Sequence, residues 1–322
     1  MGHSVTIFCA AVNDEPEQEV ATEGYLVVRR GSGRGVYREA RRFWRLEGRG
    51  NFDLVIDEVN TRPFFCVKFI REARVLVLIH QVAREVWFYE STFPIAIVGR
   101  HILEPLWLRR LRGAKIVTVS RSSQRSLGEY GLENVVIVPE GYEPKVRSQV
   151  DREVDLTLVF LGRLSANKRP YDAVEAFKIV KRAYPEAKLW VIGDGPERAR
   201  LESGAVDGVE FLGHLSESEK IKRLSAAHLL VMTSAREGWG MVVTEAALLG
   251  TPTIGYSVDG LVDSISVHGG LCVDPNPQSL GQAICRYASG ELRISVSDGL
   301  DSGSLQPWDL VAAELLQQVF PS

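Results

Sequence analysis

One short segment combines carboxylates, glycines and a helix start in an order that suits sugar and phosphate binding. It reads Arg-Glu-Gly-Trp-Gly-Met-Val-Val-Thr-Glu over residues 236–245, with a strand expected before it and a helix expected over 241–249. Carboxylates such as Glu237 and Glu245 can accept hydrogen bonds from paired sugar hydroxyls, and the backbone amides at a helix N-terminus attract phosphate. The alternative is a helix N-terminus with favourable acidic residues and no ligand. The two glutamates together with Gly238 and Gly240 favour a binding site.

A second candidate site is the loop Gly-Arg-Leu-Ser-Ala-Asn-Lys-Arg over residues 162–169, between an expected strand and an expected helix. Arg163 can bind a phosphate group through two parallel hydrogen bonds, and Lys168 adds a compact positive charge. A diphosphate at the start of the following helix would suit both side chains. The alternative is a basic loop exposed to solvent. The pattern G-x-x-x-x-G-K-[ST] is absent, so this is not a Walker loop.

A third signal is weaker. The turn Gly193-Asp194-Gly195-Pro196 would let a ligand approach the backbone, but a tight strand–helix turn has the same needs. The glycine-rich run at 31–35 lacks the spacing G-x-G-x-x-G and is expected to be a flexible loop. A nicotinamide-dependent dehydrogenase is therefore not supported.

These loops must be held by regular elements, and short apolar runs alternate with helical stretches along the whole chain. Strands are expected at 4–10, 24–29, 53–57, 74–79, 114–119, 135–138, 155–161, 187–193, 208–212, 228–233, 252–255 and 270–273. Helices are expected at 36–47, 101–112, 121–130, 170–183, 196–202, 216–226, 241–249, 278–288 and 307–320. This alternation predicts α/β architecture with parallel sheets, whose ligands bind outside the carboxyl ends of the strands.

So many strands exceed one sheet, and the Pro/Gly-containing segment at 139–145 is typical of a linker. We therefore expect two doubly wound, Rossmann-like domains facing a cleft, at 1–144 and 145–306, and a C-terminal helix at 307–322. The first 150 residues carry 22 basic and 18 acidic side chains, whereas the rest carry 16 and 23. This unequal charge suggests domains with different partners.

The composition excludes several classes of protein. A net charge of −3 over 322 residues does not suit a general nucleic-acid binder. The four cysteines form no C-x-x-C pair, which favours a reduced cytoplasmic protein without zinc or disulfides. No apolar run reaches the ~18 residues of a membrane span. Residues 36–46 and 101–112 mix arginines with apolar and aromatic residues, so they are candidates for peripheral membrane contact or for ordinary solvated helices.

Residues 155–290 resemble the donor-binding half of glycosyltransferase family 4, whose members are retaining enzymes of the GT-B fold. The resemblance rests on VFLGRLSANKRP, LWVIGDGPERARL, VEFLGHLSESEK and EGWGMVVTEAALLGTPTIGY, in this order. The first half matches more loosely, through HSVTIF, DLVIDEV, LIHQ, KIVTVSRSSQRSL and VVIVPEGY. The resemblance implies transfer of a hexose from a UDP- or GDP-sugar to a glycan or lipid-linked acceptor, with no metal or other cofactor.

The resemblance also implies roles for individual residues. Arg163 and Lys168 would bind the nucleotide diphosphate and stabilise it as the leaving group. Glu237 would contact hydroxyls of the donor sugar, Glu245 would hold the ribose, and His80 would lie near the reacting bond. Further donor contacts would come from the backbone of Gly240, Met241 and Val242, and, beside the base, from Gly193, His214 and Leu215.

The resemblance is incomplete in two places. The family opens with a strand, a Gly-Gly loop and a helix before a segment ending in G-H-x-V, whereas residues 1–5 are already that segment. A strand in the middle of the first sheet, and a loop lining the cleft, are therefore expected to be lacking. In addition, Glu140 stands where relatives usually carry Asn. The alternative function is thus a non-catalytic nucleotide-sugar-binding protein.

Overall fold

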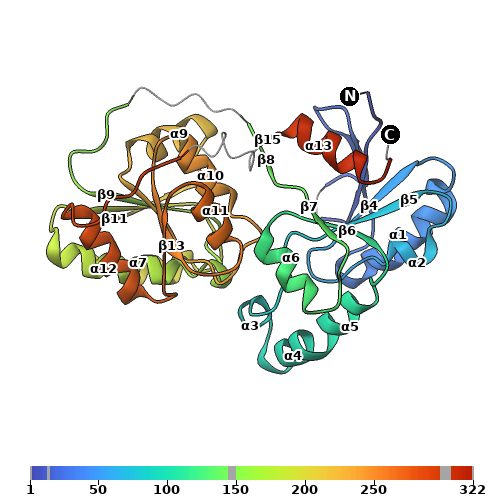
Figure 1. Ribbon diagram of the computed structural model, residues 1–322, viewed down its shortest axis with the longest axis horizontal. Coiled ribbons are helices and arrows are strands. Elements are labelled where there is room, and N and C mark those ends of the chain that lie inside the picture. The colour runs from blue at the N-terminus through green and yellow to red at the C-terminus, as the bar shows by residue number, and fades with distance from the viewer. Residues whose placement is uncertain (1, 13–14, 144–149, 298–305, 321–322) are drawn as a thin grey trace.

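The computed structural model describes residues 2–12, 15–143, 150–297 and 306–320. Two α/β units lie side by side, one formed by the first half of the chain and one by the second (Figure 1). Parallel strand pairs dominate both, which confirms the expected fold class. The predicted domain border between residues 144 and 145 lies outside the described residues.

The second unit is built on one parallel sheet with the strand order β11-β10-β9-β12-β13-β14. Its strands are β9 (Thr157–Leu161), β10 (Lys188–Ile192), β11 (Val209–Gly213), β12 (Leu229–Met232), β13 (Thr253–Tyr256) and β14 (Leu271–Val273). Its helices are η4 (Ala166–Lys168), α7 (Pro170–Ala183), α8 (Arg198–Gly204), α9 (Glu217–Ala226), α10 (Met241–Leu248), α11 (Leu261–Val267) and α12 (Pro277–Ala288). Apolar cores lie on both faces of this sheet, which is why its strands are continuous apolar runs. Of these elements, the sequence missed only the short η4 and α11.

The strands of the first unit are divided between two sheets. A parallel sheet contains β4 (Leu54–Glu58), β5 (Arg74–Leu78), β6 (Lys115–Thr118) and β7 (Val135–Ile137), in that order. A smaller sheet contains β1 (Thr6–Cys9), β3 (Leu26–Arg29) and β2 (Gln18–Val20), with β2 antiparallel to β3. Within the described residues, β1 and β4 share no backbone pairing. The sequence missed β2 because its three residues, Gln-Glu-Val, show no apolar alternation.

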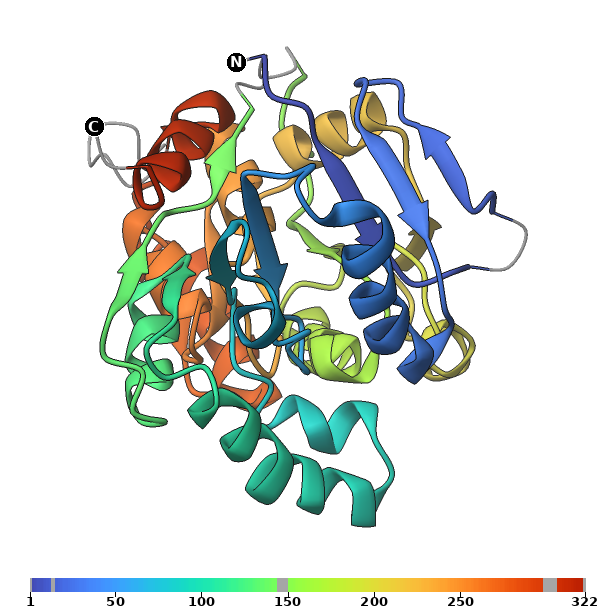
Figure 2. The same ribbon diagram turned by 90° about the vertical axis from the view of Figure 1, so that its right-hand side faces the viewer.

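The helices of the first unit are η1 (Gly33–Gly35), α1 (Val36–Phe43), η2 (Trp44–Gly48), α2 (Cys66–Phe69) and α6 (Arg121–Gly128). Between β5 and β6 the chain also forms α3 (Val86–Glu90), α4 (Phe93–Val98), η3 (Gly99–Leu103) and α5 (Glu104–Arg109). We call residues 86–109 the α3–α5 excursion. It projects from the sheet at the lower end of the molecule (Figures 1 and 2).

The last three elements of the α3–α5 excursion form one continuous helix, because Gly99 and Glu104 at the junctions keep right-handed helical dihedrals. The predicted helix at 101–112 therefore begins much earlier, at Phe93. The middle turn is π-helical and ends two residues before Pro105, whose ring and missing N–H disturb regular helix bonding.

The C-terminal helix α13 (Trp308–Gln317) packs on the first unit (Figure 1). Just before it, β15 (Gln306–Pro307) pairs with β8 (Gly141–Tyr142). Val311 shares a buried cluster with Leu76 and Val117 of the β4–β7 sheet. The chain therefore crosses between the units twice, after β8 and before β15.

Candidate active site

Two adjoining cavities lie at the carboxyl ends of β9, β10 and β12, where parallel sheets bind their ligands. The first, of about 380 Å³, is lined by residues of both units, and the second, of about 410 Å³, by the second unit alone. The predicted residues that line the first cavity are His80, Arg163, Lys168, Glu237, Gly240, Met241 and Val242. Those that line the second are Arg163, Gly193, His214 and Leu215. Loops that are far apart in the sequence thus meet at one place.

The first cavity contains an ion pair between Lys168 and Glu237. Lys168 Nζ donates a hydrogen bond to Glu237 Oε1, and Ser234 Oγ donates to the same oxygen at 2.6 Å. The loop that carries Lys168 is anchored by Thr233, whose hydroxyl lies 2.9 Å from the carbonyl oxygens of both Lys168 and Arg169. The wall of the cavity therefore holds an oriented carboxylate beside a cation, which suits a sugar hydroxyl next to a phosphate.

Helix α10 begins at the same cavity. Gly240 has a φ of 89°, a left-handed conformation that favours glycine, and no side chain caps the first turn. The amides of Met241 and Val242 therefore lie at the cavity without a side-chain partner, as an anion would require. Trp239, just before them, is held by a hydrogen bond from its Nε1 to Thr244 Oγ1 at 2.9 Å.

Arg163 lies where the two cavities meet, and its side chain is exposed. Within the part of the chain that the structure describes, no carboxylate pairs with its guanidinium. Lys168, in contrast, is already paired with Glu237. Arg163 is therefore available to bind an anion through two parallel hydrogen bonds.

Gly193 allows two loops to touch at the second cavity. Its φ is 123°, and a Cβ atom at this position would lie 2.1 Å from the carbonyl oxygen of Gly162. This contact is with backbone, so a side chain here must displace the 162–169 loop that carries Arg163 and Lys168.

We expect Gly193→Ala to lower the free energy of unfolding by about 1–3 kcal/mol and to weaken nucleotide binding, because the 162–169 loop must move. Denaturant unfolding and calorimetric titration with UDP and GDP measure the two effects. Gly204→Ala is the control, because a Cβ at Gly204 meets no atom within 4 Å. Equal behaviour of the two variants would contradict the prediction.

Glu245 does not line either cavity, although the sequence predicted that it faces the ligand beside Glu237. Its carboxylate lies 3.0 Å from Lys220 Nζ, and Lys220 lines the second cavity. Burial tends to lower the pKa of Lys220, but Glu217 and Glu245 raise it above its ordinary value overall. Sequence reasoning missed Lys220 because a lysine on the polar face of α9 looks like any solvated lysine.

His80 follows β5 and lines the first cavity from the first unit. Its Nε2 lies 3.4 Å from Glu140 Oε1, and its carbonyl oxygen accepts a hydrogen bond from Ser123 Oγ at 2.7 Å. Burial raises the pKa of Glu140, the nearby His80 opposes this, and Glu58 adds to the rise. The residue that departs from the family pattern therefore lies inside the cavity, next to His80.

Glu140→Gln is expected to make the protein more stable at neutral pH. Because the folded-state pKa of Glu140 is raised, the folded protein binds this proton more tightly than the unfolded chain does. The stabilisation from this proton is therefore lost as the pH rises from 4.5, the ordinary pKa of a glutamate, through the raised pKa of Glu140 in the folded protein. Urea unfolding should give the variant a higher free energy of unfolding than the wild-type protein at neutral pH, and no difference below pH 4.5. A lower free energy of unfolding for the variant at neutral pH would mean that the pair between Glu140 and His80 stabilises the folded protein more than burial of the carboxylate destabilises it.

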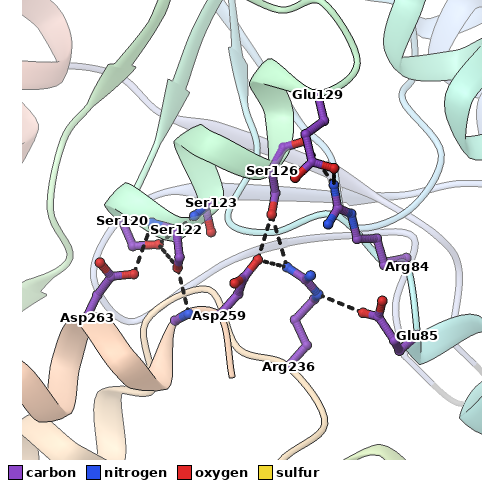
Figure 3. Close-up of polar contacts among 12 residues, drawn as sticks. Arg84, Glu85, Ser120, Ser122, Ser123, Ser126, Glu129, Arg236, Asp259 and Asp263 are labelled. Carbon is purple, nitrogen blue, oxygen red and sulfur yellow. Dashed lines mark hydrogen bonds and ion pairs between the residues drawn. The ribbon is translucent and has the colours of Figure 1, made fainter. Parts of the chain in front are cut away.

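A polar network joins the two units beside the first cavity (Figure 3). The amide of Ser122, in the first turn of α6, donates to Asp263 Oδ2 at 3.1 Å, and the amide of Gly260 donates to Ser122 Oγ at 2.7 Å. A carboxylate of the second unit thus caps a helix of the first, where the helix dipole favours negative charge.

Further along α6, Ser126 Oγ and Arg236 Nη1 both donate to Asp259 Oδ2 at 2.6 Å, and Arg236 Nε lies 3.2 Å from Glu85 Oε2 (Figure 3). Arg236 is only 6% exposed. Burial opposes ionisation of Asp259, but the bond from Ser126 and the charge of Arg236 lower its pKa overall. Sequence reasoning missed this network because its members come from four separate segments.

The two segments expected to contact a membrane differ in structure. In 36–46, Trp44 is buried and Phe43 packs against Phe8 and Phe52, so mainly arginines face solvent. In 101–112, Ile102 and Leu106 remain exposed. Among the described helices, none is long and apolar enough to cross a membrane. The described residues also contain no group of three or more His, Cys, Asp or Glu side chains that could hold a metal ion.

Comparison with solved structures shows that the fold is shared with glycosyltransferases. Sucrose-phosphate synthase from Thermosynechococcus elongatus superposes with a TM-score of 0.75 at 18% identity, over 98% of this chain and 88% of that one. A glycosyltransferase from Rickettsia africae superposes with a TM-score of 0.70 at 16% identity, over 100% of this chain and 91% of that one.

Among curated proteins, the chain is 26% identical over 213 residues to a GDP-mannose-dependent alpha-(1-6)-phosphatidylinositol dimannoside mannosyltransferase of Mycobacterium tuberculosis. The match covers 62% of this chain and 56% of that protein. A 2-deoxystreptamine glucosyltransferase of Streptomyces kanamyceticus is 31% identical over 178 residues, which are 49% of this chain and 46% of that protein. The chain thus spans about half the length of these relatives.

Two family models match consecutive parts of the chain. The model of Glycosyltransferase Family 4 matches residues 1–146, and that of glycosyl transferases group 1 matches residues 143–294. Together with the two-domain architecture and the cavity between the domains, these matches show that the chain belongs to glycosyltransferase family 4 and has the GT-B fold.

Proposed function

We propose that the protein is a retaining hexosyltransferase that moves a hexose from a UDP- or GDP-sugar to a glycan or lipid-linked acceptor. The observation that carries this proposal is the first cavity. There, an exposed and unpaired Arg163, the Lys168–Glu237 pair and the uncapped start of α10 converge within the described residues. A nucleotide sugar offers this site a diphosphate for the cations and amides, and hydroxyls for the carboxylate.

Departure of the nucleotide diphosphate leaves negative charge on a phosphate oxygen. Arg163, Lys168 and the amides of Met241 and Val242 would stabilise that charge as it develops, so the mechanism needs no metal ion. Glu237 positions the donor sugar and is not assigned as a nucleophile. In a front-face reaction, the acceptor hydroxyl attacks from the side of the leaving phosphate, which takes the proton.

The second cavity would hold the nucleoside. Gly193, His214 and Leu215 line it and would border the base. Glu245 would reach the ribose beside Lys220, to which it is paired. The relative from Mycobacterium tuberculosis is named for GDP-mannose, whereas a structure of similar fold, HepE from Anabaena, was solved with UDP and glucose. Both bases therefore belong in the donor screen.

The proposed acceptor is a glycan or a lipid-linked sugar. The name of the mannosyltransferase relative describes a lipid-linked acceptor, phosphatidylinositol dimannoside. The excess of basic side chains in the first unit supports an acceptor that carries phosphate. Four free cysteines support action in a reducing compartment such as the cytoplasm.

The test is a screen of the purified chain with UDP-glucose, UDP-N-acetylglucosamine, GDP-mannose and related donors, with and without glycan and phospholipid-linked acceptors. Nucleotide release measures turnover, and NMR of the product gives the anomeric configuration. We expect an α-linked donor to give an α-linked product. A β-linked product would overturn retention.

A non-catalytic nucleotide-sugar-binding protein is the competing outcome of the same experiment. Calorimetric titration would then show donor binding that depends on Arg163 and Lys168, while no acceptor or water releases nucleotide. The absence of both binding and turnover with every donor would reject both functions.

A further inference from the structure

The α3–α5 excursion has an apolar face that no described part of the chain covers. Its long helix buries one side, including Ala96 and Leu108. The opposite side and the adjoining α3 expose large apolar side chains, with exposed fractions from 39% to 75%. We call this set the apolar patch: Phe88, Phe93, Ile95, Ile97, Val98, Ile102 and Leu106. Single exposed apolar residues are ordinary, but a contiguous patch of this kind marks an interaction surface.

The patch continues directly into positive charge. Ile97 or Val98, Ile102 and Leu106 follow one another at helical spacing, and the same face ends in Arg109 and Arg110, which are exposed. Neither arginine pairs with a carboxylate within the described residues. Between Phe93 and Arg112 the only acidic residue is Glu104.

Glu104 does not reduce that positive charge at the surface. It is buried, and its carboxylate accepts hydrogen bonds from the backbone amides of Ala83 and Arg84 at 2.5 and 3.0 Å. The charge that this helix shows to solvent is therefore entirely positive. A helix with an apolar stripe and flanking arginines is the kind that lies in the interface of an anionic bilayer.

A second copy of the chain would satisfy this surface less well. In a two-fold symmetric contact the patch would meet itself, and the long helix that carries Arg109 and Arg110 would offer the partner no exposed carboxylate, so that only Glu90 of α3 could oppose the two arginines. A bilayer containing anionic lipids offers both the apolar interior and the phosphates that the two arginines need.

We propose that the α3–α5 excursion docks the protein on an anionic phospholipid bilayer, with the apolar patch inserted among the acyl chains and Arg109 and Arg110 bound to lipid phosphates. The excursion projects from the body of the molecule, so a flat surface can reach it (Figure 2). Its first helix, α3, lies against η4, which carries Lys168. Docking would therefore bring the first cavity close to the lipid surface, but the membrane contact itself does not depend on the proposed transferase activity.

The test is co-sedimentation of the full chain with vesicles of phosphatidylglycerol and phosphatidylcholine, compared with vesicles of phosphatidylcholine alone. We expect Arg109→Gln/Arg110→Gln to weaken binding to the anionic vesicles about thirtyfold, since each arginine near such a surface contributes about 1 kcal/mol. Ile97→Ser/Ile102→Ser should weaken binding about tenfold or more, because two apolar side chains no longer insert. Added salt should weaken binding of the wild-type protein.

Matched controls separate this surface from the rest of the molecule. Leu46→Ser and Leu310→Ser alter exposed leucines outside the patch, and Arg38→Gln/Arg45→Gln removes exposed arginines of the 36–46 segment. These variants should bind the vesicles as the wild-type protein does. All the substituted side chains are exposed, so unchanged thermal unfolding will show that each variant still folds.

Two results would overturn the proposal. One is equal vesicle binding, or none, by the wild-type protein and both patch variants. The other is concentration-dependent dimerisation that Ile97→Ser/Ile102→Ser abolishes while vesicle binding is absent, which would assign the patch to a second copy. Calorimetric titration with UDP and GDP in the same variants keeps the questions apart, because failure to dock leaves nucleotide binding intact.

Discussion

Lys168→Ala is expected to reduce kcat/KM for the preferred donor by ~10²–10³-fold, the usual effect of removing one group that stabilises developing charge. Lys168 is the cation that lies beside Glu237 in the first cavity. Its loss removes a charge for the leaving diphosphate and also one of the two groups that orient Glu237. Steady-state nucleotide release, together with calorimetric donor binding, measures how the loss divides between turnover and affinity.

Two further variants make this prediction specific. Glu237→Gln keeps the shape of the side chain but removes its charge, and we expect a loss of similar size in kcat/KM. Lys222→Ala is the matched control, since Lys222 forms an exposed 2.8 Å pair with Glu219 on α9, away from both cavities. Unchanged rates in both Lys168→Ala and Glu237→Gln would refute the assignment of this site.

The second large effect is expected from Arg236→Met, which removes the centre of the network between the units. Arg236 is nearly fully buried and bonds Asp259 of its own unit and Glu85 of the other. Removing one partner of a buried, hydrogen-bonded charge pair typically costs several kcal/mol, and the partial exposure of Asp259 puts the expected loss near ~2 kcal/mol. We also expect a higher KM for the donor, because residues of both units line the first cavity.

The effect of Arg236→Met should depend on pH in a defined direction. Because the folded-state pKa of Asp259 is lowered, its contribution to stability is present above the ordinary aspartate value of 3.8 and is lost as the pH falls through the folded value. The difference in free energy of unfolding between the variant and the wild-type protein should therefore become smaller as the pH is lowered. Arg286→Met is the control, as its 2.7 Å pair with Glu291 is exposed on both sides and should contribute at most about 0.5 kcal/mol. A pH-independent loss equal to that of the control would contradict a role in joining the units.

The second unit was largely predictable because its chemistry is local. The cations of 162–169, the turn at Gly193 and the start of α10 each follow a strand directly. The strand–loop–helix order therefore places them at one edge of a parallel sheet. Local spacing did not show the partner of Glu245. Its position on α10 predicted a ligand contact, and in the structure its side chain pairs with Lys220 of α9, which lines the second cavity.

The first unit was less predictable for physical reasons that particular elements illustrate. The three-residue strand β2 is too short to show a period, and the helix that begins at Phe93 looked shorter because its first turns are uniformly apolar. An apolar residue at helical spacing has the same sequence signature whether another element covers it or solvent does. Trp44 proved to be buried and Ile102 exposed, although both lie in segments that mix arginine with apolar residues.

The sequence alone determined the family resemblance, the alternation of strands and helices and the loops that carry Arg163, Lys168 and Glu237. These features depend on neighbours within one strand–loop–helix unit. Only the tertiary structure decided the pair of His80 with Glu140, the bond from Ser126 to Asp259 and the exposure of the apolar patch. These contacts join residues far apart in the chain and depend on how the two units dock. The spacing of residues along the chain cannot predict these contacts, because they form only when separate elements have been brought together.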